Sequence, residues 1–147
     1  MFARTLRTAS SPARTLLTHP HPRCFSSTTP ARKVYEDVSA SDFESRVLSP
    51  SPADADTPVL VDFYATWCQP CKLLSPALKK VASDASVVGG KAVDLVTVDV
   101  DVHQQLAQQF KVSAMPTVIA MKRGKVIDGF VGMLPEKKLI EFVQNLK

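Results

Sequence analysis

The chain has 147 residues, which is room for one domain of ordinary size, and its 45% hydrophobic and 22% charged residues are typical of a globular protein. No apolar run approaches the roughly 20 residues that a membrane-spanning helix needs. The formal net charge of +4 does not indicate nucleic-acid binding, because residues 36–147 carry 12 Lys and Arg against 14 Asp and Glu and are therefore mildly acidic.

The first 33 residues have the composition of a mitochondrial transit peptide. They contain six basic residues and no acid, and they lack the apolar run of about 7–15 residues that a secretory signal needs. Arg23 fits two processing patterns, which place the new start at Ser26 or at Lys33. We therefore expect residues 1–33 to be a disordered leader that directs the protein to the mitochondrial matrix, with the mature chain beginning between Ser26 and Val34. A disordered tail without a targeting role and a chloroplast leader are the alternatives.

Residues 34–147 predict one domain of alternating strands and helices. In chain order we expect a strand at 35–38, a helix at 41–48, a strand at 59–65, a helix from the cysteines to about 82, a strand at 93–99, a helix at 102–110, a hairpin of strands at 116–121 and 125–131, and a final helix from 135. The segment Ser41-Asp-Phe-Glu44 is a capping-box pattern and predicts where the first helix begins. The order of elements predicts an α/β fold with helices covering a mixed sheet.

Cys68 and Cys71 lie two residues apart in the expected domain, whereas Cys24 lies in the leader. A structural zinc site needs four ligands, and the domain adds only one histidine, His103, in a polar helical turn. A disulfide that closes so small a loop constrains little of the unfolded chain. The pair therefore indicates redox chemistry rather than a stabilising bridge, and we expect no metal.

The position of the pair supports this interpretation. A strand followed by Cys-x-x-Cys and a helix places Cys68 at the helix N-terminus, where unpaired amides and the helix dipole stabilise a thiolate. Cys71 follows one turn later, within reach of a disulfide, and Pro70 constrains the backbone of that turn. Lys72 adds a positive charge beside the pair. The expected cycle is attack by Cys68 on a partner's disulfide, followed by resolution of the mixed disulfide by Cys71.

Asp62 lies in the middle of the apolar segment 59–65. If it is buried without a partner, its pKa rises. A buried carboxyl group six residues before Cys68 is suited to relay the proton that Cys71 must lose. An exposed position on the strand, with no role in the reaction, is the alternative interpretation.

Several separated motifs resemble the thioredoxin family over residues 34–146. The matching segments are Val61-Asp-Phe-Tyr-Ala65, Trp67-Cys-Gln-Pro-Cys-Lys72, Pro76, Val98-Asp99, Ala114-Met-Pro-Thr117, Gly124 and Phe130-Val-Gly132. The resemblance implies a thioredoxin fold, with a five-stranded mixed sheet flanked by four helices. It also implies that Cys68 is the attacking thiol, Cys71 the resolving thiol and Asp62 the buried acid, with the ring of Trp67 beside the active site.

Three further residues match the substrate groove of the family. Pro116 matches a cis-proline opposite the disulfide, although an isolated X–Pro bond is cis in only about 5–6% of cases. The resemblance implies that the backbone of Met115 pairs with a bound substrate chain. Gly132 matches a glycine that keeps the groove open.

Two positions depart from the family pattern. Gln69 stands where the family usually has Gly, and residues between the cysteines tune the redox potential and docking. The family often has a Lys near the buried acid, on the next strand, where this chain has Leu95 by our alignment. Without that charge, Asp62 should be easier to keep protonated.

The predicted function is a thiol–disulfide oxidoreductase that reduces protein disulfides through Cys68 and Cys71. The resemblance implies recharging by an NADPH-dependent thioredoxin reductase, peroxiredoxins among the substrates, no bound cofactor and a monomeric protein. The alternative is a thioredoxin-fold binding or assembly module with incidental redox activity, which would need none of Cys68, Cys71, Asp62 and Pro116.

Overall fold

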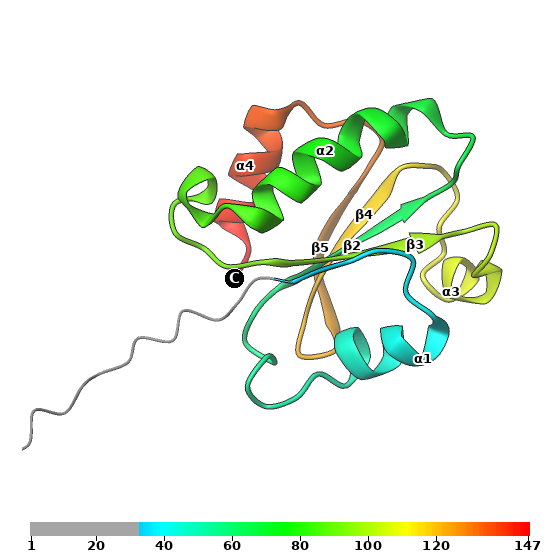
Figure 1. Cartoon of the computed structure of the whole chain (residues 1–147), viewed down its shortest axis with the longest axis horizontal. Helices are drawn as coiled ribbons and strands as arrows, with labels where there is room; N and C mark the ends of the chain where they lie inside the picture. Colours follow the sequence, from blue (N-terminus) through cyan, green and yellow to red (C-terminus); the bar gives the residue numbers. More distant parts are fainter. Residues whose placement is uncertain (1–32) are drawn as a thin grey trace, which may run out of the picture.

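The structure is a computed structural model that describes residues 33–147. The expectations for residues 1–32 lie outside the described residues. Those described fold into five strands and four α-helices in the predicted order (Figure 1). The strands are β1 (Val34–Tyr35), β2 (Val59–Tyr64), β3 (Asp94–Asp99), β4 (Thr117–Lys122) and β5 (Lys125–Val131). The α-helices are α1 (Ala40–Phe43), α2 (Gln69–Ser83), α3 (Gln104–Gln109) and α4 (Glu136–Asn145). Helix α1 continues into a π-helical turn, η1 (Glu44–Leu48), and α2 is followed by a 3-10 turn, η2 (Ala85–Val88).

The strands form one mixed sheet in the order β1-β3-β2-β4-β5. β1, β3 and β2 are parallel, whereas β4 is antiparallel to both β2 and β5. β2 lies at the centre, and its first five residues are all buried. The sequence of β2 is apolar at nearly every position because a central strand is covered by helices on both faces.

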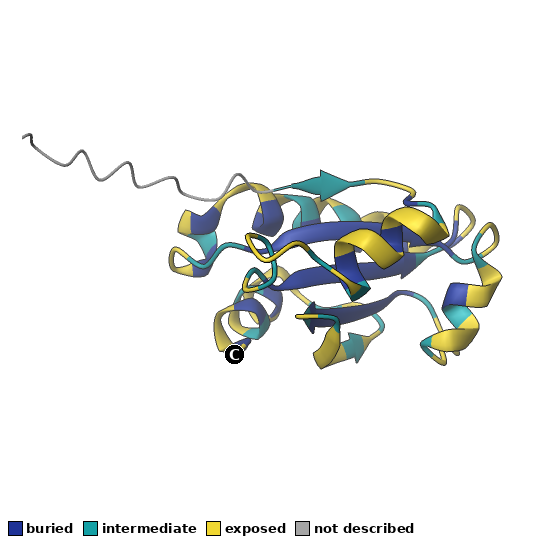
Figure 2. Cartoon of the chain, turned by 90° about the horizontal axis from the view of Figure 1, so that it is seen from below, coloured by how far each residue is buried: buried dark blue, intermediate teal, exposed yellow. Residues whose placement is uncertain are grey.

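Helices cover both faces of the sheet, with α2 and α4 on one side and α1 and α3 on the other (Figure 1). Each face has its own apolar core. Leu60 of β2 packs with residues of α2 and α4, whereas Val61 and Phe63 pack with residues of α1, η1 and α3. Buried residues are accordingly concentrated in β2, β3 and β4 and on the inner sides of the helices (Figure 2).

The first helix begins earlier than the capping-box pattern predicted. Its N-cap is Ser39, whose Oγ accepts a hydrogen bond from the backbone N–H of Asp42 at 3.1 Å and donates to the Asp42 carboxylate at 2.7 Å. The start predicted at Ser41 is therefore wrong by two residues. Ser39 and Asp42 have the same three-residue spacing as a capping box, with Asp as the acid.

Candidate active site

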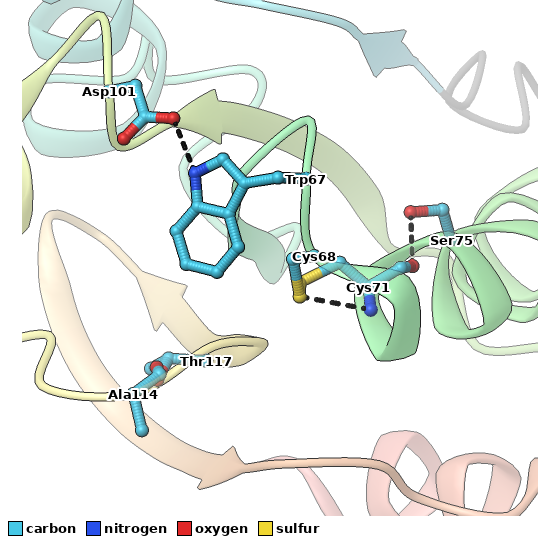
Figure 3. Close-up of a disulfide and its surroundings, with 7 residues drawn as sticks. All are labelled: Trp67, Cys68, Cys71, Ser75, Asp101, Ala114 and Thr117. Carbon is cyan, nitrogen blue, oxygen red and sulfur yellow. Dashed lines mark hydrogen bonds between the residues drawn. A yellow bond between two sulfur atoms is a disulfide. The ribbon is translucent and has the colours of Figure 1, made fainter.

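Cys68 and Cys71 form a disulfide at the N-terminus of α2 (Figure 3). Cys68 is the N-cap residue, and its Sγ accepts a hydrogen bond from the backbone N–H of Cys71 at 3.3 Å. The position predicted for Cys68 is thus confirmed, and it exposes the sulfur to the amides and the dipole that stabilise a thiolate. Cys68 is 4% exposed and Cys71 1% exposed, so the second sulfur is the more enclosed.

The other residues of the first helical turn are exposed. Gln69 and Pro70 are the first two residues of α2, and both are in contact with solvent. Lys72 is also exposed, and its backbone N–H donates to the carbonyl of Cys68 at 3.3 Å. An N–H in the first turn of a helix has no intrahelical acceptor, so the missing N–H of Pro70 costs no hydrogen bond at this position.

Trp67 lies beside the disulfide on the side of β3. Its side chain is 63% exposed, and its Nε1–H donates to the Asp101 carboxylate at 2.9 Å (Figure 3). The sequence motifs did not single out Asp101, but its position in the chain was a usable signal. Asp101 comes two residues after β3, and Trp67 comes three residues after the parallel strand β2. The carboxyl ends of neighbouring parallel strands meet at one edge of the sheet.

The segment before β4 lies opposite the disulfide (Figure 3). The Met115–Pro116 peptide bond is cis, as the resemblance implied, and Met115 packs against the buried cluster of Ala65, Cys68 and Cys71. Thr117 Oγ1 donates to the carbonyl of Ala114 at 2.6 Å and closes this turn. β4 is antiparallel to β2, with Thr117 opposite Phe63, so the start of β4 meets the end of β2.

Gly132 is joined to this segment by one hydrogen bond. Its N–H donates to the carbonyl of Pro116 at 2.7 Å. Its φ of +89° lies in the left-handed region, and a Cβ placed on it would meet no atom within 4 Å. The space over Gly132 is therefore open, as expected of a residue beside a groove.

Asp62 is buried and 1% exposed. Neither of its carboxylate oxygens has a hydrogen-bond partner in the described part of the chain. Burial raises its pKa from 3.8 to about 7. The alternative of an exposed strand position is therefore wrong, and the predicted rise in pKa is confirmed.

Strand geometry places Asp62 on the face of β2 that packs with α2, the helix that carries the dithiol. Side chains alternate along a strand, so Leu60, Asp62 and Tyr64 lie on the same face of β2, and Leu60 packs with α2. Tyr64 packs against the buried cluster of Ala65, Cys68 and Cys71, and successive residues of one face are about 7 Å apart. Asp62 is therefore one such step along β2 from a residue that packs against the cluster containing the redox pair.

The neighbour of Asp62 on β3 is not Leu95. The register of the two strands pairs Asp62 with Thr97 and Leu60 with Leu95, so the alignment was wrong by two residues. Thr97 is buried, and its Oγ1 accepts a hydrogen bond from the backbone N–H of Asp37 at 3.0 Å. The conclusion about charge is unaffected, because Thr97 is neutral as well.

Within residues 33–147, no helix has the length and apolar character to cross a bilayer. The same residues contain no group of three or more His, Cys, Asp or Glu side chains arranged to hold a metal ion.

Comparison with known proteins agrees with this geometry. The Thioredoxin family model matches residues 34–145. The mitochondrial thioredoxins of Bos taurus and Mus musculus are each 39% identical to this chain, over 98% and 99% of it and over 82% and 83% of their own lengths. A thioredoxin of Haemophilus influenzae is 38% identical over 74% of this chain and 92% of its own. A solved mutant thioredoxin from Halobacterium salinarum shares the fold, with a TM-score of 0.63 and 23% identity over 79% of this chain and 92% of that one.

The fold, the Cys-x-x-Cys disulfide at the start of a helix and the relatives thus lead to one assignment. The family model covers almost the whole described domain, and the most similar relatives mentioned above match nearly the full chain. The chain belongs to the thioredoxin family, and it is a thiol–disulfide oxidoreductase whose substrates are proteins that contain disulfides.

Proposed function

We propose that Cys68 and Cys71 carry the reaction in two distinct roles. In the reduced protein, the Cys68 thiolate attacks one sulfur of a substrate disulfide, and the other substrate sulfur leaves as a thiolate. Cys71 then loses its proton and attacks the Cys68 sulfur of the mixed disulfide. The remaining substrate sulfur leaves, so the substrate gains two electrons and the protein ends with the Cys68–Cys71 disulfide.

The observation that carries this assignment is the different position of the two sulfurs in α2. Cys68 is the N-cap, where backbone N–H groups and the helix dipole favour a thiolate. Cys71 is inside the first turn and almost completely buried, so a partner protein reaches it less easily. The two steps require an attacker that favours the thiolate and a resolver that is more enclosed than the attacker.

Asp62 is proposed as the proton acceptor for Cys71. A base is most effective when its pKa is near the working pH, and the Asp62 pKa of about 7 satisfies this condition. Its carboxylate has no hydrogen bond to another described residue that would hold it in one protonation state. Transfer through one water molecule would connect it to the thiol.

The substrate is proposed to bind across the segment opposite the disulfide. Met115 packs against the cluster that contains both cysteines, so a chain that pairs with its backbone would present its own disulfide to Cys68. Gly132 leaves space for that chain, and Trp67 offers an exposed ring at the other side. Three exposed residues of the first turn of α2, Gln69, Pro70 and Lys72, would surround the approach and tune the potential.

The place of the reaction is inferred from the relatives and the leader. The related mitochondrial thioredoxins and the arginine-rich leader support a mitochondrial protein that works in the matrix after cleavage between Ser26 and Val34, with residues 34–147 as its domain. The family resemblance supports an NADPH-dependent thioredoxin reductase as the electron donor and peroxiredoxins among the substrates. The protein would act as a monomer without a bound cofactor.

Insulin reduction by dithiothreitol tests the proposed activity. We expect catalytic amounts of the protein to accelerate precipitation of the reduced insulin chains, and Cys68→Ser to abolish the acceleration because the attacking thiolate is lost. A binding module with incidental redox activity would show no acceleration by the wild type. Full activity of Cys68→Ser would refute the assigned attacker.

Trapping experiments test the second step. Cys71→Ser keeps the attacker but lacks the resolver, so mixed disulfides with substrate proteins should accumulate and should dissolve on reduction. Gel electrophoresis without reductant detects them. The matched variant Cys68→Ser should give none, and equal amounts of adducts on both variants would contradict the two roles.

A further inference from the structure

The first residue of the described fold is held by a buried carboxylate. The backbone N–H of Lys33 donates to Asp94 Oδ1 at 2.9 Å, and its carbonyl accepts from the N–H of Leu95 at 3.0 Å. Asp94 begins β3 and is only 8% exposed. The pairing of the N-terminal strand with β3 thus begins at Lys33, and a side-chain carboxylate accepts its amide hydrogen.

The carboxylate of Asp94 lacks a full countercharge. Among the described residues, the one cationic group that acts on Asp94 is the ammonium of Lys33, whose Nζ is also paired with Asp54 at 3.3 Å. Arg46 borders the same pocket, but its guanidinium lies over the ring of Tyr35, 4.1 Å from the centroid. Burial raises the pKa of Asp94 above its ordinary value, and the hydrogen bond and charge of Lys33 oppose this only in part. One more positive charge at the backbone nitrogen of Lys33 would balance the cluster.

We propose that the mature chain begins at Lys33 and that its new α-ammonium group forms an ion pair with the Asp94 carboxylate. Hydrolysis of the Arg32–Lys33 peptide bond consumes one water; Arg32 leaves with a new carboxylate, and Lys33 keeps the amine, which takes up a proton. The neutral amide at 2.9 Å from Asp94 thereby becomes a charged donor at the same position.

The geometry distinguishes this start from the other one that Arg23 predicts. A chain that begins at Ser26 carries its α-ammonium seven residues before Lys33 and leaves Asp94 with a neutral amide. A pocket of about 260 Å³ adjoins Lys33 and Asp94, so the remaining N–H groups of an ammonium there have room for water. The proposal rests on the proposed removal of a mitochondrial leader, but not on the redox roles of the cysteines.

Import of the full-length chain into isolated mitochondria tests the cleavage site. The N-terminus of the processed protein is read by mass spectrometry, and we expect Lys33. A final start at Ser26, or at any residue other than Lys33, overturns the proposal and leaves the proposed location intact. Failure of import contradicts both the location and the cleavage site, whereas the insulin assay would still report the redox function.

A second measurement tests the ion pair itself. The chain beginning at Lys33 is assembled by chemical ligation at Cys68, once with a free α-amine and once with an acetylated one, which restores a neutral amide. At pH 6.5, below the ordinary α-amino pKa of about 7.7–8.0, the free amine is protonated. The unfolding equilibrium constant of this form should therefore be roughly fivefold lower than that of the acetylated form. In Asp94→Asn the two forms should unfold alike. Equal unfolding of the two forms in the wild-type sequence, or the same difference in Asp94→Asn, overturns the ion pair.

Discussion

Asp62 is buried without a hydrogen-bond partner among the described residues, and in the proposed relay its pKa of about 7 would give the reaction a pH dependence near neutrality. Its carboxylate accepts a proton from Cys71 only when it is ionised, so resolution should accelerate as the pH rises through about 7. We expect Asp62→Asn to reduce insulin turnover at least tenfold at pH 7.5. The deficit should shrink toward pH 9, where hydroxide removes the proton of the Cys71 thiol without the relay.

Turnover between pH 6 and 9 checks this prediction. Asp94→Asn is the matched control, since it neutralises another buried acid that lies at the far end of the strand pair and should keep the wild-type profile. An unchanged profile in Asp62→Asn, with the fold retained by circular dichroism, would show that the relay is not needed.

Gly132 allows the groove to be tested separately from backbone strain. Gly132 and Gly90 both have left-handed φ angles, +89° and +86°, and a Cβ on either would meet no atom within 4 Å. Alanine should therefore destabilise the fold similarly at both positions, by about 1–2 kcal/mol. Only Gly132→Ala should also raise the KM for insulin, because its methyl group would project beside the substrate segment.

Urea unfolding and insulin kinetics on both variants provide the comparison. A KM that rises equally in Gly132→Ala and Gly90→Ala would mean that destabilisation, rather than the groove, explains the effect. An unchanged KM in Gly132→Ala would remove Gly132 from the proposed groove.

At the scale of elements, the first helix depends on a cap that lies two residues before the predicted one. Ser39 accepts the hydrogen bond from Asp42, whereas the Oγ of Ser41 contacts only the Oγ of Ser39, at 3.0 Å. Ser39→Ala should lower the free energy of unfolding by about 1 kcal/mol, because an orphan N–H loses its acceptor. Ser41→Ala should cost less than half of that amount, and urea titration measures both; a larger loss in Ser41→Ala would restore the predicted cap.

Helix α2 positions both cysteines of the disulfide. Its start at Cys68 places the attacking sulfur at the positive end of the dipole, and its inner side packs against Leu60 of β2. Because β2 is central, α2 is fixed against the most buried part of the sheet. The two sulfurs are thus held on a rigid support, as reaction geometry requires.

At the scale of the whole molecule, burial of Asp62 makes stability fall as the pH rises. Its pKa is 3.8 ordinarily and about 7 in the folded protein, so between these values the folded state holds a proton that the unfolded state has lost. The contribution is fully present below pH 3.8, decreases up to about pH 7 and is constant above. At 1.36 kcal/mol per pH unit, the loss between pH 5 and pH 8 is about 3 kcal/mol.

The isosteric variant Asp62→Asn cannot ionise and should not show this loss. Urea unfolding of the oxidised proteins at pH 5 and pH 8 checks the prediction: the stability advantage of Asp62→Asn over the wild type should be larger at pH 8 than at pH 5. An advantage that is equal at the two values, or larger at pH 5, would mean that the carboxylate is not desolvated in solution.

The sequence by itself determined the elements and the nature of the site. Apolar periodicity, together with capping and turn residues, predicted the strands and helices in order, because core-facing side chains recur with the period of the element that carries them. The Cys-x-x-Cys spacing at a strand-to-helix junction predicted a redox pair, since the chemistry of Cys68 and Cys71 depends on one helical turn. Both signals come from neighbours in the chain, and local geometry fixes them.

Only the tertiary structure decided how distant residues meet. The burial of Asp62 depends on cover from another layer, and the identity of its neighbour, Thr97 rather than Leu95, depends on strand register. The hydrogen bond from Trp67 to Asp101 joins residues 34 apart, and that from Lys33 to Asp94 joins residues 61 apart. Such contacts form when the sheet is assembled, because strand order and register bring these residues together.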